Sequence, residues 1–136
     1  MRKIICCLVA LVVLVGCGQK KDTGSIDASV VENTTKIKFE RDVIDFKRVQ
    51  AGEKVTGSFR FTNAGSSDLV IYEVSTSCGC TVVDYPRSAI APGESSTISL
   101  TYDSDGASGM RISKEVVVLA NTEPAKTKLR IVADVY

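Results

Sequence analysis

Hydrophobic and polar residues alternate along most of the chain after residue 36. A period of two residues is typical of β-strands with one buried face, because successive side chains of a strand point to opposite sides. No stretch repeats the 3.6-residue period of an amphipathic helix. The alternation predicts about seven short strands, whose apolar positions are Ile37 and Phe39, Ile44 and Phe46, Val55 to Phe61, Val70 to Val74, Ile98 to Tyr102, Val116 and Val118, and Leu129 to Val135.

Turn-forming residues separate the predicted strands. Asn63 to Asp68, Pro92-Gly93 and Asp103 to Gly109 supply the glycine, proline, asparagine and aspartate typical of short turns. About seven strands over roughly 100 residues predict an all-β, immunoglobulin-like antiparallel β-sandwich. A small closed barrel is the alternative on the same pattern. The Cys…Trp…Cys arrangement of antibody domains is absent, since the chain has no tryptophan.

Most aromatic residues follow the apolar positions of this pattern. Those predicted to lie in the core are Phe39, Phe46, Phe59, Phe61, Tyr72 and Tyr102. Tyr85 precedes Pro86 outside the alternation, and we expect it to be exposed. The acidic residues fall mainly on turns or on the outward positions of strands, which is typical of a solvated face.

The first residues of the chain are typical of a secretory signal. Arg2 and Lys3 precede an uncharged run of 12 residues, Ile4 to Val15, which is far shorter than the roughly 20 residues of a membrane-spanning helix. The run leads into Gly16 and Cys17, and the sequence Leu-Val-Gly-Cys resembles the lipobox of bacterial lipoproteins. The resemblance implies cleavage before Cys17 and lipid attachment to that cysteine. An ordinary signal peptide with a chance cysteine is the alternative.

This interpretation divides the chain into three parts. Residues 1–16 are the predicted lipoprotein signal peptide, residues 17–35 a lipidated N-terminus and flexible tether, and residues 36–136 the sandwich domain. Gly18, rather than an aspartate, follows the predicted lipid-bearing cysteine, which favours the outer membrane under the sorting rules of some lipoproteins. We therefore expect a protein of the bacterial cell envelope, anchored to the membrane through lipid on Cys17, with its periplasmic or surface exposure left open.

Net charge gives no indication of a nucleic-acid partner. The predicted signal holds two of the 17 basic residues, so the mature chain would carry 15 against 16 acidic residues, a net charge near −1. Without a basic excess or a long run of like charges, we expect no nucleic acid as a partner. The lipid, rather than charge, would make the membrane association.

The composition also excludes several kinds of active site. The chain has no histidine, which removes Ser-His-Asp and Cys-His catalysis and the commonest ligand for zinc and copper. The segment around Asp103, Asp105 and Gly106 resembles a calcium loop, but Thr101 and Ile112 occupy the positions of the first and last ligands. No catalytic residue, metal site or cofactor is therefore predicted, and we do not expect an enzyme.

A set of short motifs resembles one bacterial family. The motifs are Ile44-Asp45-Phe46, Gly52-Glu53, Phe59 to Gly65, Ser77-Cys78-Gly79-Cys80-Thr81, Pro92 to Ser95, Tyr102-Asp103, Gly109 and Asn121. They resemble the domain-of-unknown-function family 1573, which recurs in lipoproteins of Gram-negative bacteria and is similar to Hydin-type (ASH) immunoglobulin-like domains. The resemblance implies a fold but no activity. The family usually has glycine where this chain has Lys47, which makes a tight backbone turn unexpected at that residue.

Cys78 and Cys80 flank one glycine in the most specific of these motifs. In an extended strand their side chains would share one face, with Cα atoms roughly 6.6 Å apart. Such a strand would hold the sulfur atoms close but unbonded, unless Gly79 bends the backbone. Three interpretations stay open: a structural pair, buried or simply bridged; a redox pair; and a soft-metal site for Cu(I). The structural pair is favoured, because cysteine is among the most buried residue types.

These observations favour a lipid-anchored envelope protein whose immunoglobulin-like domain acts as a binding or scaffold module. Such domains hold partners through strand edges and loops. Besides the membrane, we expect an envelope protein or a polysaccharide of unknown identity as the partner. The alternative is a thiol–disulfide oxidoreductase or redox sensor that uses Cys78 and Cys80.

Overall fold

The computed structural model describes residues 33–136. The predicted signal peptide, Cys17 and residues 18–32 of the predicted tether lie outside the described residues. The described part contains eight strands, β1 (Ile37–Phe39), β2 (Val43–Val49), β3 (Lys54–Asn63), β4 (Ile71–Thr76), β5 (Thr81–Asp84), β6 (Ser95–Asp103), β7 (Arg111–Ala120) and β8 (Lys126–Val135). No helix within residues 33–136 is long and apolar enough to cross a membrane.

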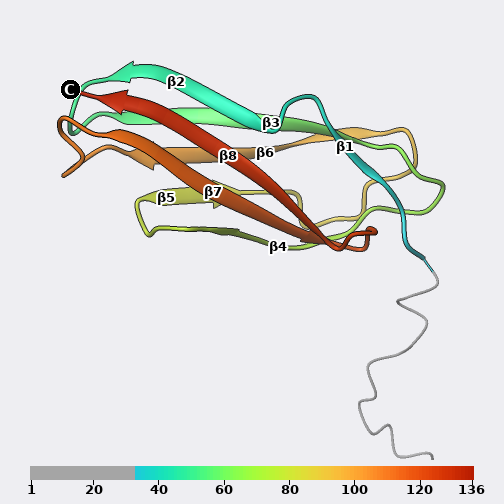
Figure 1. Cartoon of the computed structure of the whole chain (residues 1–136). Coiled ribbons are helices and arrows are strands. Elements are labelled where there is room, and N and C mark those ends of the chain that lie inside the picture. Colours follow the sequence, from blue (N-terminus) through green and yellow to red (C-terminus); the bar gives the residue numbers. More distant parts are fainter. Residues whose placement is uncertain (1–32) are drawn as a thin grey trace, which may run out of the picture.

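The strands form two four-stranded sheets that pack face to face (Figure 1). One sheet has the strand order β1-β3-β6-β5 and the other β2-β8-β7-β4. This confirms the predicted all-β, immunoglobulin-like sandwich, with eight strands rather than about seven, and excludes the closed barrel. One pair departs from the antiparallel prediction, because β2 and β8 run parallel. The chain passes from one sheet to the other between β1 and β2.

The core lies between the sheets and is built by the strands with the cleanest alternation. Its side chains with at most 2% exposure include Phe59, Phe61, Ile98, Leu100, Tyr102, Val116, Val118, Leu129 and Ile131. The predicted register is therefore confirmed in β3, β6, β7 and β8. Burial of these apolar surfaces stabilises the fold by about 25 cal/mol per Å² removed from water.

The register of β4 differs from the prediction. Ile71 is buried at 5% exposure and Tyr72 is 47% exposed, although the alternation places Val70 and Tyr72 in the core. The register against β7 shifts between Ile71 and Glu73, where a β-bulge inserts an extra residue. Val74 then returns to the inner face and packs against the core. The bulge explains why a simple period of two fails at the start of this strand.

β2 contains the backbone turn that Lys47 made unexpected. Lys47 has a φ of 61°, in the left-handed region that glycine adopts most readily. Its N–H donates to Oδ1 of Asp45 at 2.8 Å, and the register against β8 shifts between Asp45 and Arg48. The same N–H stabilises the carboxylate and so holds the pKa of Asp45 below its ordinary value. The turn therefore forms with lysine in place of glycine.

The two ends of the sandwich carry different loops (Figure 1). The chain enters at the end that holds the β3–β4, β5–β6 and β7–β8 connections. There the Asn63 amide accepts the O–H of Thr35 at 2.8 Å and donates to the C=O of Ile90 at 2.8 Å. Asn121 donates to the C=O of Asn33 at 2.9 Å. The two asparagines thus hold the entering chain in place through hydrogen bonds. The β4–β5 loop, which contains the Cys-Gly-Cys motif, lies at the opposite end of the sandwich, the same end as the C-terminus (Figure 1).

Candidate functional site

The Cys-Gly-Cys motif lies in the loop that carries the chain from β4 in one sheet to β5 in the other. β4 ends at Thr76 and β5 begins at Thr81. The interpretation of the motif as part of one extended strand is therefore wrong. The chain turns at residues 77–80, and the Sγ atoms of Cys78 and Cys80 form a disulfide with Cα atoms 5.4 Å apart. This separation is shorter than the roughly 6.6 Å of an extended strand. The turn thus brings the two thiols into bonding reach.

Hydrogen bonds hold this loop to both sheets. The N–H of Ser77 donates to the C=O of Glu115 on β7 at 3.1 Å, and the N–H of Glu115 donates to Oγ of Ser77 at 3.1 Å. On the other side, the N–H of Asp103 at the end of β6 donates to the C=O of Cys80 at 2.9 Å. The path of the loop is therefore fixed by three hydrogen bonds as well as by the disulfide.

Both cysteines are half-buried, whereas the structural interpretation favours burial. Gly79 between them is exposed, and a β-carbon added to it would meet no atom within 4 Å. Sγ of Cys78 lies 3.8 Å from Oγ1 of the buried Thr81. The disulfide is therefore reached from solvent on the glycine side, and a hydroxyl group lies beside Cys78.

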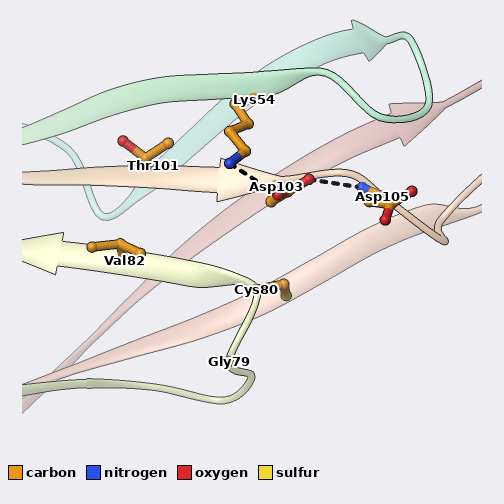
Figure 2. Close-up of a pocket in the computed structure, with 7 residues that line it drawn as sticks. All are labelled: Lys54, Gly79, Cys80, Val82, Thr101, Asp103 and Asp105. Atoms are coloured by element: carbon orange, nitrogen blue, oxygen red, sulfur yellow. Dashed lines mark hydrogen bonds and ion pairs between the residues drawn. The ribbon is translucent and has the colours of Figure 1, made fainter.

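A hollow of about 290 Å³ lies next to the disulfide on the outer face of the β1-β3-β6-β5 sheet (Figure 2). Its lining residues are Lys54, Gly79, Cys80, Val82, Thr101, Asp103 and Asp105. Val82 is 71% exposed, more than any other large hydrophobic side chain in residues 33–136. The exposed Val82 and one cysteine of the disulfide, Cys80, therefore line the same hollow.

A second hollow, of about 400 Å³, lies on the side of Cys80 that faces the β6–β7 connection. Its lining includes the half-exposed Met110 and the side chains that follow it at the start of β7. Cys80 lines both hollows, and Cys78 lines neither of them. The two sulfur atoms thus differ in their surroundings.

The charged residues of the first hollow are partly paired (Figure 2). Lys54 Nζ lies 3.5 Å from Oδ2 of Asp103, and Oδ1 of Asp103 accepts the N–H of Asp105 at 3.0 Å. Burial raises the pKa of Tyr102, and the charge of Asp103 adds to the rise, so the phenol stays protonated. Among residues 33–136 the Asp105 carboxylate forms no ion pair. The charge left unpaired in this hollow is therefore negative.

The segment that resembles a calcium loop forms a turn. The hydrogen bond from the Asp105 N–H to the Asp103 carboxylate is the local contact that aspartate makes in turns. Within the part of the chain that the structure describes, no three His, Cys, Asp or Glu side chains come together as a metal site requires. A Cu(I) site at the motif would need two thiolates, and here the sulfur atoms of Cys78 and Cys80 are bonded to each other.

Sequence reasoning singled out the two cysteines but not the surface around them. If the alternation of Val70 to Val74 continued through the motif, Val82 would face inward, but the turn before β5 reverses the register and Val82 faces outward. The doublet Val82-Val83, which breaks the alternation, is the one signal of this reversal. Lys54 and Asp105 carry no signal, because only the folded chain brings their loops beside the motif.

The two four-stranded sheets and their strand order define an immunoglobulin-like β-sandwich. Within this class, the chain belongs to the family described as protein of unknown function (DUF1573), whose model matches residues 37–135. The match confirms the resemblance drawn from the motifs and spans every strand of the sandwich, from β1 to β8. A search of the curated proteins finds no match.

Solved structures share this fold at low sequence identity. A protein of unknown function from Porphyromonas gingivalis W83 aligns with a TM-score of 0.67 and 19% identity, over 75% of this chain and 47% of that one. The ASH/PapD-like domain 7 of human CEP192 aligns with a TM-score of 0.62 and 12% identity, over 95% and 97%. This chain thus spans about half the length of the first structure and nearly all of the second.

A third similar structure comes from a bacterial assembly system. A chain of the CsuC–CsuE chaperone–tip adhesion subunit pre-assembly complex, from the Csu pili of Acinetobacter baumannii, aligns with a TM-score of 0.53 and 14% identity. The alignment covers 73% of this chain and 56% of that one. At such identities the likeness shows the fold alone.

Proposed function

We propose that this chain is a lipid-anchored binding module of the bacterial cell envelope. Cys17 carries the lipid that holds the protein to the membrane, and Gly18 after it favours the outer membrane. The sandwich binds an extended segment of a partner protein. The binding site is the free edge of β5. A chain anchored through its N-terminus has the entry end of the sandwich toward the membrane and the disulfide end away from it, where a partner has access (Figure 1).

The free edge of β5 carries this proposal. The C=O of Cys80 accepts the N–H of Asp103, so Cys80 occupies a hydrogen-bonded position of the β5–β6 ladder, and Val82 repeats that position two residues on. Hydrogen-bonded and non-hydrogen-bonded pairs alternate in an antiparallel ladder. Thr81 and Val83 therefore direct their N–H and C=O groups away from β6. An extended peptide is the partner whose backbone satisfies such groups.

The other sheet edges are less available. β1 has three residues, and Lys47 with its left-handed turn interrupts β2, which is a feature that protects edges from added strands. At β4 the partly buried Tyr85, expected to be exposed, donates its O–H to the C=O of Tyr72 at 3.4 Å. The guanidinium group of Arg87 lies 3.8 Å from the centre of the Tyr85 ring and covers it. β5 has four residues and neither a left-handed turn nor a covering side chain, and Val83 is the more exposed of its two edge-directed residues.

The surface next to this edge suits a side chain of an added strand. Val82 projects from the outer face of β5 into the hollow described above. A neighbouring strand would place alternate side chains over the same face, where apolar contact with Val82 adds to the backbone hydrogen bonds. Protein binding by a related sandwich, as in the chaperone–tip adhesion subunit complex, supports the proposal by analogy of fold.

Val83→Pro tests the proposal. The N–H of Val83 points away from β6, so proline there removes no bond of the sheet but blocks an added strand. Val83→Ala is the matched control, because it removes similar packing and keeps the N–H. We expect cross-linking in intact envelopes to join the wild type and Val83→Ala to a protein partner, and Val83→Pro to lose that product while its circular dichroism stays unchanged. An adduct that survives in Val83→Pro, or a polysaccharide adduct, would contradict binding at this edge.

A further inference from the structure

We propose that the Cys78–Cys80 disulfide is a thiol–disulfide exchange site that oxidises a dithiol in an extended polypeptide, with Cys80 as the sulfur attacked. This activity goes beyond binding at the β5 edge and does not depend on it. Four features of the structure carry it: the small size of the closed loop, the two hollows that the half-buried Cys80 lines, the hydroxyl group beside Cys78 and the unpaired acidic charge of the neighbouring hollow.

The disulfide contributes little to holding the fold together. It joins residues two apart in sequence, and a cross-link constrains the unfolded chain less as the loop it closes becomes shorter. The disulfide of antibody domains, in contrast, ties one sheet to the other. Here the Ser77–Glu115 and Cys80–Asp103 hydrogen bonds already fix the ends of the loop. A bond with this small structural effect is free to open and close without unfolding the sandwich.

Access favours Cys80 over Cys78. Cys80 lines a hollow on each side, and Gly79 beside it leaves open space where a side chain would otherwise stand. Figure 2 shows Cys80 at the start of β5, with Gly79 in the exposed turn beside it. An attacking thiolate of a client peptide therefore reaches Sγ of Cys80 from the hollow. Exposed disulfides are also the more readily exchanged ones.

The hydroxyl group of Thr81 suits Cys78 as the leaving group. In the first step the client thiolate bonds to Sγ of Cys80, and the electron pair of the broken S–S bond goes to Sγ of Cys78, which lies 3.8 Å from Oγ1 of Thr81. A hydroxyl donor at this place stabilises the thiolate. The second client thiolate then attacks the client sulfur and releases Cys80. The client loses two electrons and two protons, the protein becomes a dithiol, and a donor disulfide reoxidises it by the reverse exchange.

The hollow indicates which clients fit. Val82 offers an exposed apolar contact, and the Asp105 carboxylate is the charge without an ion pair, since Asp103 lies against Lys54. A client cysteine flanked by an apolar residue and by lysine or arginine complements both. We expect unfolded or extended dithiol segments of this composition to react fastest.

The first experiment measures oxidation of a probe peptide. The oxidised mature chain is mixed with a reduced, unstructured peptide that holds two cysteines beside leucine and lysine, and the thiols that appear on the protein are alkylated and counted by mass spectrometry. We expect one peptide disulfide formed per protein dithiol, with a slower reaction for the same peptide carrying glutamate in place of lysine. A protein disulfide that stays intact with excess peptide and with excess reduced glutathione overturns the proposal.

The second experiment tests the order of the two sulfur atoms. Cys78→Ser and Cys80→Ser each leave one thiol, which is offered a single-cysteine form of the peptide activated as a mixed disulfide with thionitrobenzoate. The protein thiolate attacks the peptide sulfur, thionitrobenzoate leaves, and the adduct that forms has no second peptide thiol to release it. We expect Cys78→Ser, which keeps Cys80, to form this adduct roughly tenfold faster than Cys80→Ser, because access controls exchange. Equal rates, or the reverse order, would contradict attack at Cys80. The wild-type assay does not depend on how these variants fold.

Thr81 is then a positioning residue with its own test. Thr81→Val keeps the shape of the side chain and removes the hydroxyl group, whereas Thr81→Ser keeps the hydroxyl group. We expect oxidation of the peptide to slow by about tenfold in Thr81→Val, as loss of one hydrogen bond to a charged group implies, and to recover in Thr81→Ser. The pH profile for alkylation of reduced Cys78 should move upward in Thr81→Val alone. An unmoved profile would assign Thr81 to packing only.

Discussion

Lys47 holds a backbone conformation that favours glycine, at a φ of 61°. For a residue with a β-carbon the left-handed region costs roughly 1–2 kcal/mol. The side chain does not offset this cost, since its 3.1 Å ion pair with Asp45 is solvent-exposed and such pairs contribute little. The turn persists because the Lys47 N–H bonds to the Asp45 carboxylate and the β2–β8 register shift absorbs the extra residue.

Lys47→Gly should therefore stabilise the domain. Relief of the backbone cost outweighs the extra entropy of glycine in the unfolded chain, and we expect a gain of about 0.5–1 kcal/mol in the free energy of unfolding. Urea denaturation measures it. Lys47→Ala is the control, because alanine keeps the β-carbon and should show no gain. A less stable Lys47→Gly variant would mean that the ion pair to Asp45 outweighs the backbone cost.

At the scale of a strand, successive side chains of β3 point alternately into the core and toward solvent. The ring of Phe61 has no exposed surface and lies 5.6 Å, centre to centre, from that of Phe39. Arg60, one residue earlier, points outward and forms a 3.3 Å ion pair with Glu40. The two neighbours thus report on opposite faces of one strand.

Phe61→Ala should cost roughly 3–5 kcal/mol of stability, from lost transfer energy and the cavity left behind. A domain of this size has about 5–15 kcal/mol in total, so the variant approaches unfolding at room temperature. Arg60→Ala should cost less than about 1 kcal/mol, because its ion pair is exposed. Both values come from urea denaturation of the purified domain. A greater loss of stability in Arg60→Ala than in Phe61→Ala would mean that the inner and outer faces of β3 are assigned the wrong way round.

The elements differ in how far they can be predicted from sequence, and the differences have physical causes. β3, β6, β7 and β8 have nine or ten residues each, which is long enough for the period of two to stand out. β4 departs from the predicted register because its bulge places Tyr72 on the outer face. β5 is hard to predict because it has only four residues and follows a turn that the alternation does not indicate. The parallel pairing of β2 with β8 leaves no trace in the alternation, since parallel and antiparallel strands share that period.

The candidate site shows the same division. Cys78 and Cys80 stand out in the sequence because thiols one residue apart are rare and chemically distinctive. Lys54, Val82 and Asp105 do not, because their meeting depends on how three connections come together at one end of the sandwich. Residue types are therefore visible in the sequence, whereas the hollow and the free edge of β5 are properties of the folded chain.

At the scale of the whole molecule, entry and disulfide lie at opposite ends of the sandwich (Figure 1). The backbone N–H of Thr35 donates to the C=O of Asn121 at 2.9 Å, and side-chain bonds to Asn63 and Asn121 reinforce this entry point. The N-terminal segment therefore joins the sandwich at one defined end. The proposed binding edge and exchange site lie in the half of the sandwich opposite this entry point, which is the half farther from the membrane in the proposed anchored form.

Cys17→Ala tests the anchor on which this orientation rests. If the Leu-Val-Gly-Cys segment is a lipobox, the sulfur of Cys17 receives the lipid before cleavage, so alanine should abolish both steps. We expect the short mature form to disappear from gels, the longer precursor to accumulate and labelling with radioactive palmitate to be lost. Cys7→Ala, inside the predicted signal, is the matched control and should be processed and labelled like the wild type. Normal cleavage of Cys17→Ala, with unchanged membrane fractionation, would instead indicate an ordinary signal peptide and remove the basis for placing the disulfide end away from the membrane.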